Sequence, residues 1–117
     1  MPDDELLQSL VIDLRRGTLT LAVLSCLKRP QYGYSLLQTM EKEGIRIEAN
    51  TLYPLLRRLE SQGLLQSEWD TAENRPRKYY ALNDRGRALF VQLKAEWQRM
   101  TREIGELLND EKDGETK

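Results

Sequence analysis

Residues 48–60 bring together side chains of the kinds that contact DNA. Four leucines in this segment recur at the spacing of one helical face: Leu52, Leu55, Leu56 and Leu59. At about 100° per residue, the other face carries an amide, an aromatic ring and two cations: Asn50, Tyr53, Arg57 and Arg58. A helix that is apolar behind and cationic in front has the make-up of one that enters a DNA groove. The alternative is an ordinary amphipathic surface helix whose arginines are solvated.

A polar loop between two predicted strands follows this helix. Gly63 suits a helix C-cap in the left-handed conformation, and residues 65–69 then alternate as a half-buried strand does. Residues 78–82 form the second predicted strand, and the exit of the loop carries three cations: Arg75, Arg77 and Lys78. Helix, strand, basic loop and strand outline a winged helix whose wing meets the phosphate backbone. A solvated hairpin tip is the alternative, because the loop begins with acidic residues.

Three motifs, in this order, resemble the PadR family of bacterial transcriptional regulators. They are Gln-Tyr-Gly-Tyr at 31–34, the segment beginning Asn-Thr-Leu-Tyr-Pro at 50–64, and Asn-Arg-Pro-Arg-Lys-Tyr-Tyr-Ala-Leu at 74–82. The resemblance runs from about Gly17 to about Phe90, and the short remainder is similar to that of the family's small members, which have one long last helix. It implies a winged helix-turn-helix that binds double-stranded DNA.

Two positions depart from the family pattern. Asn74 stands where the family usually has glycine, although asparagine can still take a left-handed turn. Glu48 stands where a cap such as serine is common, so we expect the cap to pass to Asn50. Pro54 is best tolerated in a first turn, which places the helix start near Asn50; a start near Glu48 would require a bend. The N-terminal turn is the part expected to face the groove: Asn50, Thr51 and Tyr53.

Two helices should precede the helix predicted at residues 48–60, which we call the reading helix. The first, within residues 3–28, has an apolar stripe and contains Gly17, which either kinks one long helix or separates two. The second begins near Tyr32, and its first N–H groups, together with Ser35, are positioned to accept a phosphate. Tyr32 and Tyr34 are equally compatible with core or hinge positions, and for Tyr34 the core is the favoured interpretation.

A final helix should begin at Asn83, a good N-cap, and present a heptad stripe. The stripe consists of Phe90, Leu93, Trp97, Met100, Ile104 and Leu107. A lone helix projecting from a small domain cannot bury such a stripe, so we interpret it as a homodimer interface. Its predicted partners are the last helix of the other subunit and that subunit's N-terminal stripe, which includes Leu6 and Leu10. Two-fold symmetry suits two half-sites on DNA.

Trp97 has two compatible interpretations. As a large aromatic residue in the middle of the stripe, it is most simply an anchor of the dimer core. The family resemblance implies the second, because in small members this helix resembles one that lines a cavity at the dimer centre for flat aromatic compounds. The walls here would be Leu10, Leu14, Phe90, Leu93, Trp97 and Met100. Flat rings and a flexible methionine suit a small hydrophobic effector.

The composition bounds the fold. With 117 residues, of which 39% are hydrophobic, the chain can form one small domain that gains from a partner. We predict a mainly α fold with a small two-stranded β wing, that is, a winged helix-turn-helix with N- and C-terminal dimerisation helices. Its expected parts are an N-terminal helical segment at 3–28, the rest of the winged helix at 29–82, a dimerisation helix at 83–109 and a disordered acidic tail at 110–117.

Several classes of function are disfavoured. The chain has no histidine, one cysteine and no Gly-rich phosphate loop, which argues against an enzyme, a metal site and a bound cofactor. Cys26 lies among leucines and is interpreted as a buried, unreactive thiol. The acidic N-terminus and the absence of a long apolar run predict a cytoplasmic protein with no membrane contact.

The favoured function is therefore a DNA-binding transcriptional repressor, released by a small hydrophobic effector. The rival is a winged-helix module that binds proteins and has lost DNA binding, which the formal net charge of −1 permits.

Overall fold

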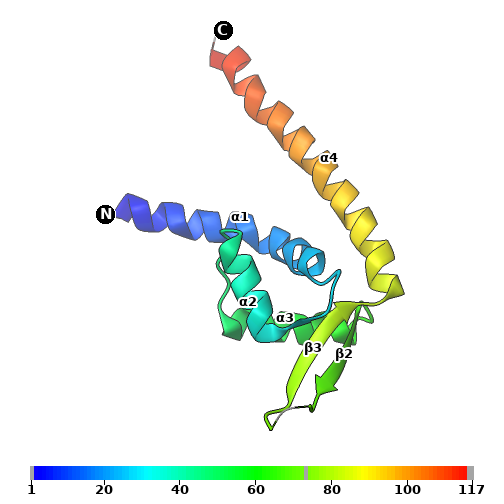
Figure 1. Cartoon of the computed structure of the whole chain (residues 1–117). Coiled ribbons are helices and arrows are strands. Elements are labelled where there is room, and N and C mark those ends of the chain that lie inside the picture. Colours follow the sequence, from blue (N-terminus) through cyan, green and yellow to red (C-terminus); the bar gives the residue numbers. More distant parts are fainter. Residues whose placement is uncertain (1, 73, 116–117) are drawn as a thin grey trace.

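The computed structural model describes residues 2–72 and 74–115 as four helices and a small sheet (Figure 1). In chain order the elements are α1 (Pro2–Cys26), β1 (Gln31–Tyr32), α2 (Gly33–Lys42), α3 (Ala49–Ser61), β2 (Leu65–Asp70), β3 (Arg77–Leu82) and α4 (Asp84–Glu115). This is a winged helix with a long helix at each end, so the predicted mainly α fold with a small wing is confirmed.

The sheet has one strand more than the predicted two-stranded wing. Its strands are antiparallel in the order β1-β3-β2, and β2 and β3 match the predicted wing strands to within one residue at their ends. The additional strand β1 has only two residues, which pair with Tyr80 and Tyr79 of β3. A strand this short has no alternating pattern, and it fastens the start of α2 to the wing.

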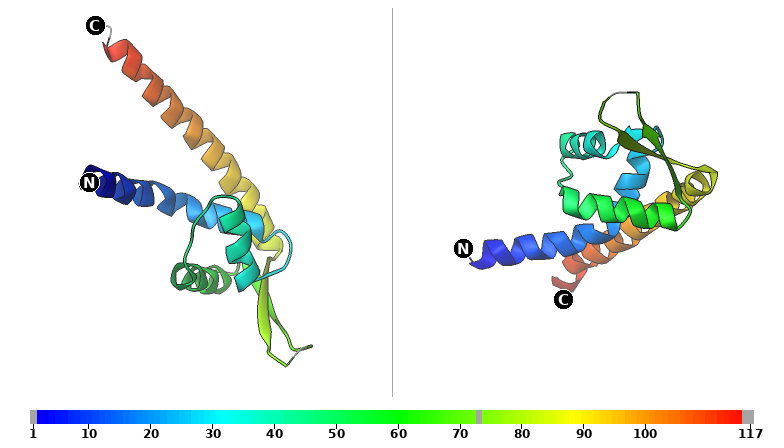
Figure 2. Two further views of the ribbon diagram at one scale, coloured as in Figure 1. Left: turned by 60° about the vertical axis from the view of Figure 1, so that its left-hand side comes forward. Right: turned by 90° about the horizontal axis from the view of Figure 1, so that it is seen from below.

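One hydrophobic core joins the four helices and the sheet. The four leucines of α3 form its centre, with exposures between 0% and 8%, which confirms the predicted apolar face of that helix. Around them lie residues of α1, α2, β2, β3 and α4: Val23, Leu24, Leu27, Leu36, Met40, Leu65, Tyr80, Leu82 and Phe90. The first half of α1 and most of α4 extend beyond this core and diverge from each other (Figures 1 and 2).

Most predicted helix boundaries are found in the structure. Gly44 follows α2 and Gly63 follows α3, with φ values of 81° and 82° that favour glycine. Asn83 is the N-cap of α4, because its side-chain oxygen accepts the N–H of Gly86 at 2.8 Å. The helix α1 is continuous through Gly17, which settles the open choice between one helix and two.

The predicted helix cap at Asn50 is wrong. The helix α3 begins at Ala49, so Glu48 takes the N-cap position and makes no side-chain cap, whereas Asn50 lies inside the first turn. Pro54 consequently lies within the helix, where it cannot donate to the carbonyl of Asn50.

Two further predictions differ from the structure. Tyr34 is 68% exposed rather than part of the core, because it lies on the outer side of the first turn of α2. The helix α4 continues to Glu115, so residues 110–115 of the predicted disordered tail are helical. Residues 116 and 117 lie outside the described part of the chain.

Candidate nucleic-acid interface

The helix α3 presents one face to solvent between the wing and α1. Opposite its buried leucines it exposes Asn50, Pro54, Arg57 and Ser61. Asn50 and Arg57 are seven residues apart, which places them two turns apart on the same face of the helix. An amide and a guanidinium so placed can donate to base edges and to phosphates. This outer face is the strongest candidate for contact with DNA.

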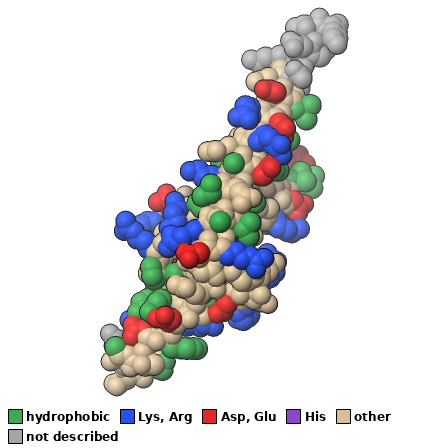
Figure 3. Space-filling model, turned by 90° about the vertical axis from the view of Figure 1, so that its right-hand side faces the viewer, with side chains coloured by type: hydrophobic (Ala, Val, Ile, Leu, Met, Phe, Trp, Pro, Cys, Tyr) green, Lys and Arg blue, Asp and Glu red, His purple; other side chains and the backbone are tan. Residues whose placement is uncertain are grey.

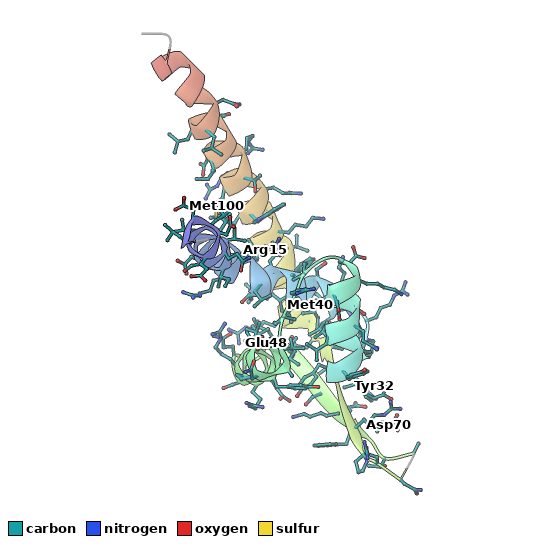
Figure 4. All side chains as sticks on the ribbon, turned by 90° about the vertical axis from the view of Figure 1, so that its left-hand side faces the viewer. Arg15, Tyr32, Met40, Glu48, Asp70 and Met100 are labelled. Carbon is teal, nitrogen blue, oxygen red and sulfur yellow. The ribbon has the colours of Figure 1, made fainter. Side chains whose placement is uncertain are left out.

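Thr51 and Arg58 lie on a different side of α3. Thr51 lines a hollow of about 590 Å³ between α1 and the segment that precedes α3, where Arg15 and Glu48 also lie (Figure 4). Arg58 lines a second hollow, against Leu24 of α1 and the first half of α4. Both side chains are exposed, and their predicted contacts with DNA stay predictions.

Tyr53 is half-buried and fills the space between α3 and α2. A Cβ atom built on Gly33 would lie 2.4 Å from the Tyr53 ring, so the ring contacts the α2 backbone where only glycine fits. Tyr53 therefore helps set the distance between the two helices of the helix-turn-helix. Its predicted contact with bases stays a prediction. Gly33, in the Gln-Tyr-Gly-Tyr motif, is the sequence feature that could have indicated this close approach.

The three cations of the wing do not form one cluster. Successive residues of a strand point to opposite faces of the sheet, so Arg77 and Lys78 are separated. The guanidinium of Arg77 stacks 4.2 Å from the ring centroid of Tyr32. The ammonium of Lys78 faces α3 instead and lies 3.4 Å from the carboxylate of Glu60. Arg75, in the loop between β2 and β3, is exposed and is the wing cation best placed for a phosphate.

Tyr32 connects the start of α2 to the base of the wing. Its hydroxyl donates to the carboxylate of Asp70, and its ring meets that of Tyr79 edge-on at 5.7 Å (Figure 4). The Tyr32 hydrogen bond is the main cause that lowers the pKa of Asp70 below its ordinary value, and the Ala72 N–H adds to it. The hydroxyl of Ser35 donates to the Tyr32 carbonyl at 3.1 Å. The predicted phosphate site at Tyr32 and Ser35 thus lies at a fixed junction between α2 and the wing.

Residues that sequence reasoning missed hold this junction. Asp70 accepts a hydrogen bond from the Tyr32 hydroxyl, and Glu68 accepts one from the Tyr79 hydroxyl at 2.8 Å. The hydrogen bond to Glu68 raises the pKa of Tyr79. Glu60 accepts from Ser67 and Lys78 across the gap between α3 and the wing. Acidic residues within a supposed DNA-binding surface gave no sequence signal, because their partners are set by strand register.

The long helices carry apolar side chains that the described protomer does not cover. On α4 these are Leu93, Trp97, Met100, Ile104 and Leu107, with exposures between 40% and 65%. On α1 they include Leu6, Leu10 and Leu14, with exposures of 56% or more. Phe90 differs from the rest of the predicted stripe, because it is 9% exposed and lies in the protomer's own core under the Lys28 ammonium. The stripe is therefore uncovered in the protomer from Leu93 onward, whereas Phe90 is covered.

The charge on the surface is mixed. On the face in Figure 3, acidic and basic side chains alternate along the long helix, with hydrophobic side chains between them. This face is not uniformly positive, so a DNA contact would need a local cluster of cations rather than a general positive field.

Other kinds of site find no support in the described residues. Within 3–72 and 74–109, where side chains are described, no three histidine, cysteine or acidic side chains are grouped to hold a metal ion. None of the helices searched there has the length and hydropathy of a membrane span. Cys26 is half-buried, and burial raises the pKa of its thiol, which agrees with an unreactive cysteine.

The fold and the exposed face of α3 define a winged-helix protein of the DNA-binding class. Comparisons with known proteins narrow this class. Residues 21–92 match the Transcriptional regulator PadR-like family. A crystal structure of a PadR family transcriptional regulator from Eggerthella lenta is 51% identical, with a TM-score of 0.89 over 92% of this chain and 96% of that one. A transcriptional regulator from Clostridium thermocellum is 28% identical, with a TM-score of 0.75 over 80% and 96%.

A curated relative agrees with these structures. The transcriptional regulator Rv3488 of Mycobacterium tuberculosis is 36% identical over 73 residues, which cover 62% of this chain and 68% of that protein. The chain belongs to the PadR-like family of transcriptional regulators. Its family and structural neighbours are regulators rather than enzymes.

Proposed function

We propose that this regulator is a homodimeric repressor that binds a roughly palindromic operator and is released by a small hydrophobic effector. The observation that carries the proposal is the outer face of α3, where Asn50 and Arg57 are exposed on one side of a helix whose other side is the core. In this arrangement Asn50 reads base edges from the first turn of α3, and Arg57 and the wing residue Arg75 contact the backbone.

Dimerisation follows from the apolar stripe of α4. The five side chains from Leu93 to Leu107 and the exposed leucines of α1 form two apolar surfaces that diverge from one core (Figure 1). A second copy related by a two-fold axis would cover both surfaces and present two α3 helices about 34 Å apart, one turn of DNA. The same interface supplies the proposed effector site beside Trp97, with Met100 and Leu10 as neighbouring walls.

Selection of bound fragments from genomic DNA tests the proposal. The purified protein is incubated with sheared host DNA, and the enriched fragments define an operator for affinity measurements. Asn50→Ala should change the base preference at one position of each half-site, whereas Arg57→Ala should weaken all sequences alike. Arg102→Ala is the matched control. It removes an exposed arginine from α4 instead of α3 and should leave the affinity for DNA unchanged. If no fragment is enriched above non-specific binding, the function is that of a protein-interaction module instead.

A further inference from the structure

Three side chains from different elements meet between α3, the proposed recognition helix, and the wing. Glu60 lies in the last turn of α3, Ser67 in the middle of β2, and Lys78 near the start of β3. The Ser67 hydroxyl donates to Oε2 of Glu60, and the Lys78 ammonium donates to Oε1 of the same carboxylate at 3.4 Å. A single carboxylate thus holds one residue from each strand of the wing.

The register of the wing strands places the Lys78 side chain toward α3. Lys78 pairs with Trp69, and Ser67 with Tyr80, so all four side chains lie on the α3 side of the sheet. The ammonium lies 5.3 Å from the Tyr80 ring centroid and 6.0 Å from that of Trp69. Both partners of the ion pair are partly covered, with exposures of 30% for Lys78 and 32% for Glu60. Lys78 is therefore held by a carboxylate and two rings.

We propose that Glu60 is a positioning residue that fixes the wing relative to the recognition helix, and that Lys78 is its counter-ion rather than a phosphate contact. The inference rests on the proposed function, because the wing and α3 must contact the same DNA. If Lys78 turned toward a phosphate, Glu60 would lose its cation and leave an uncompensated negative charge between the wing and α3. The pKa of Glu60 lies below its ordinary value, chiefly because of the Ser67 hydrogen bond and then because of Lys78, so the carboxylate is charged at neutral pH.

Arg75 differs from Lys78 in each of these respects. It is exposed, it lies in the loop beyond the strands, and among the described residues it makes no ion pair within 4.0 Å. A cation of that kind displaces a counterion from the DNA when it contacts a phosphate, and so contributes to the salt dependence of DNA binding. The two wing cations therefore have separable effects.

Salt titration of operator binding tests the inference. The logarithm of the association constant is measured against the logarithm of salt concentration for the wild type, Lys78→Met and Arg75→Met. Methionine keeps most of the aliphatic stem and removes the charge. Arg75→Met should lower the slope by about one unit per DNA-bound subunit. Lys78→Met should weaken binding by a similar factor at every salt concentration and keep the wild-type slope. A loss of slope in Lys78→Met equal to that in Arg75→Met would place Lys78 on a phosphate and overturn the inference.

A measurement without DNA separates this inference from the proposed function. Residual dipolar couplings of backbone amides report the orientation of β2 and β3 relative to α3. Glu60→Ala and Lys78→Met should each change that orientation, and Lys78→Met should raise the pKa of Glu60 measured by NMR titration. Arg75→Met is the matched control, because it removes one charge from the exposed loop of the same wing and should leave the orientation unchanged. An unchanged orientation in Glu60→Ala would refute the positioning role, even if the protein selects no DNA.

Discussion

Replacing Ile104 with aspartate should separate the proposed dimer into monomers. Ile104 is 53% exposed in the protomer and belongs to the uncovered stripe on α4, two turns after Trp97. Its side chain gains burial only if a second copy covers the stripe. An aspartate there would either keep its charge in a dry interface or take up a proton, and both outcomes oppose association.

The expected loss follows from the exposed fraction. Full burial of an isoleucine side chain contributes about 1.5–3 kcal/mol, so the exposed half accounts for about 1 kcal/mol per subunit. Desolvating an unpaired carboxylate adds about 2–3 kcal/mol after relaxation toward the rim of the interface. Two-fold symmetry counts each substitution twice, which gives about 6–8 kcal/mol. The dissociation constant should rise by a factor on the order of 10⁴ or more.

Sedimentation velocity across a range of protein concentrations measures this change. Gln98→Asp introduces the same charge on the outer side of the same helix, where the side chain is exposed, and should remain dimeric. Operator affinity should fall in Ile104→Asp only, because one reading helix binds one half-site alone. If Ile104→Asp sediments as a dimer at the same concentrations as Gln98→Asp, the stripe on α4 is not the interface.

Four further substitutions have defined outcomes. Gly86→Ala places a Cβ atom 2.1 Å from a backbone carbonyl oxygen and should destabilise the fold by about 3 kcal/mol in urea unfolding, whereas Gly17→Ala, with nothing within 4 Å, should stabilise it by about 0.5 kcal/mol. Tyr32→Phe should lower the melting temperature at neutral pH, because it removes the hydrogen bond from the Tyr32 hydroxyl to the charged Asp70 carboxylate. Since this bond lowers the pKa of Asp70, the difference in melting temperature from the wild type should shrink as the pH falls below about 4. Trp97→Ala should abolish calorimetric binding of planar hydrophobic compounds while the ligand-free protein stays on its operator; retained binding would locate the effector elsewhere.

The elements of the fold were predictable because their signals are local. Four leucines at helical spacing identified α3, and the alternation after Gly63 identified β2. Asn83 was recognisable as a cap because asparagine before an acidic first turn is a short-range pattern. Each of these inferences needs only residues within a few positions of one another.

The candidate site was less predictable because it depends on pairings between distant residues. Treating Arg75, Arg77 and Lys78 as one basic cluster ignored the alternation of side chains within β3, which sends Arg77 to Tyr32 and Lys78 to Glu60. Thr51 and Arg58 also line hollows beside α1 and α4, which their positions in the helical repeat did not reveal. Helical periodicity distinguishes a buried face from an exposed one, but it does not say which neighbour lies beside each flank.

The contacts at the base of α4 offer a route by which an effector would change DNA binding. The Asn83 amide donates to the carbonyl of Gly63, directly after α3, at 2.9 Å, and Gly86 packs against the backbone of Leu64. The first turn of α4 is thus fixed to the end of the recognition helix. In the proposed dimer, a ligand beside Trp97 that favours one angle between the two α4 helices would carry each α3 with it and change the spacing of the reading helices. Operator affinity would change only to the extent that the ligand prefers one spacing over the other, since a ligand with equal affinity for both shifts nothing.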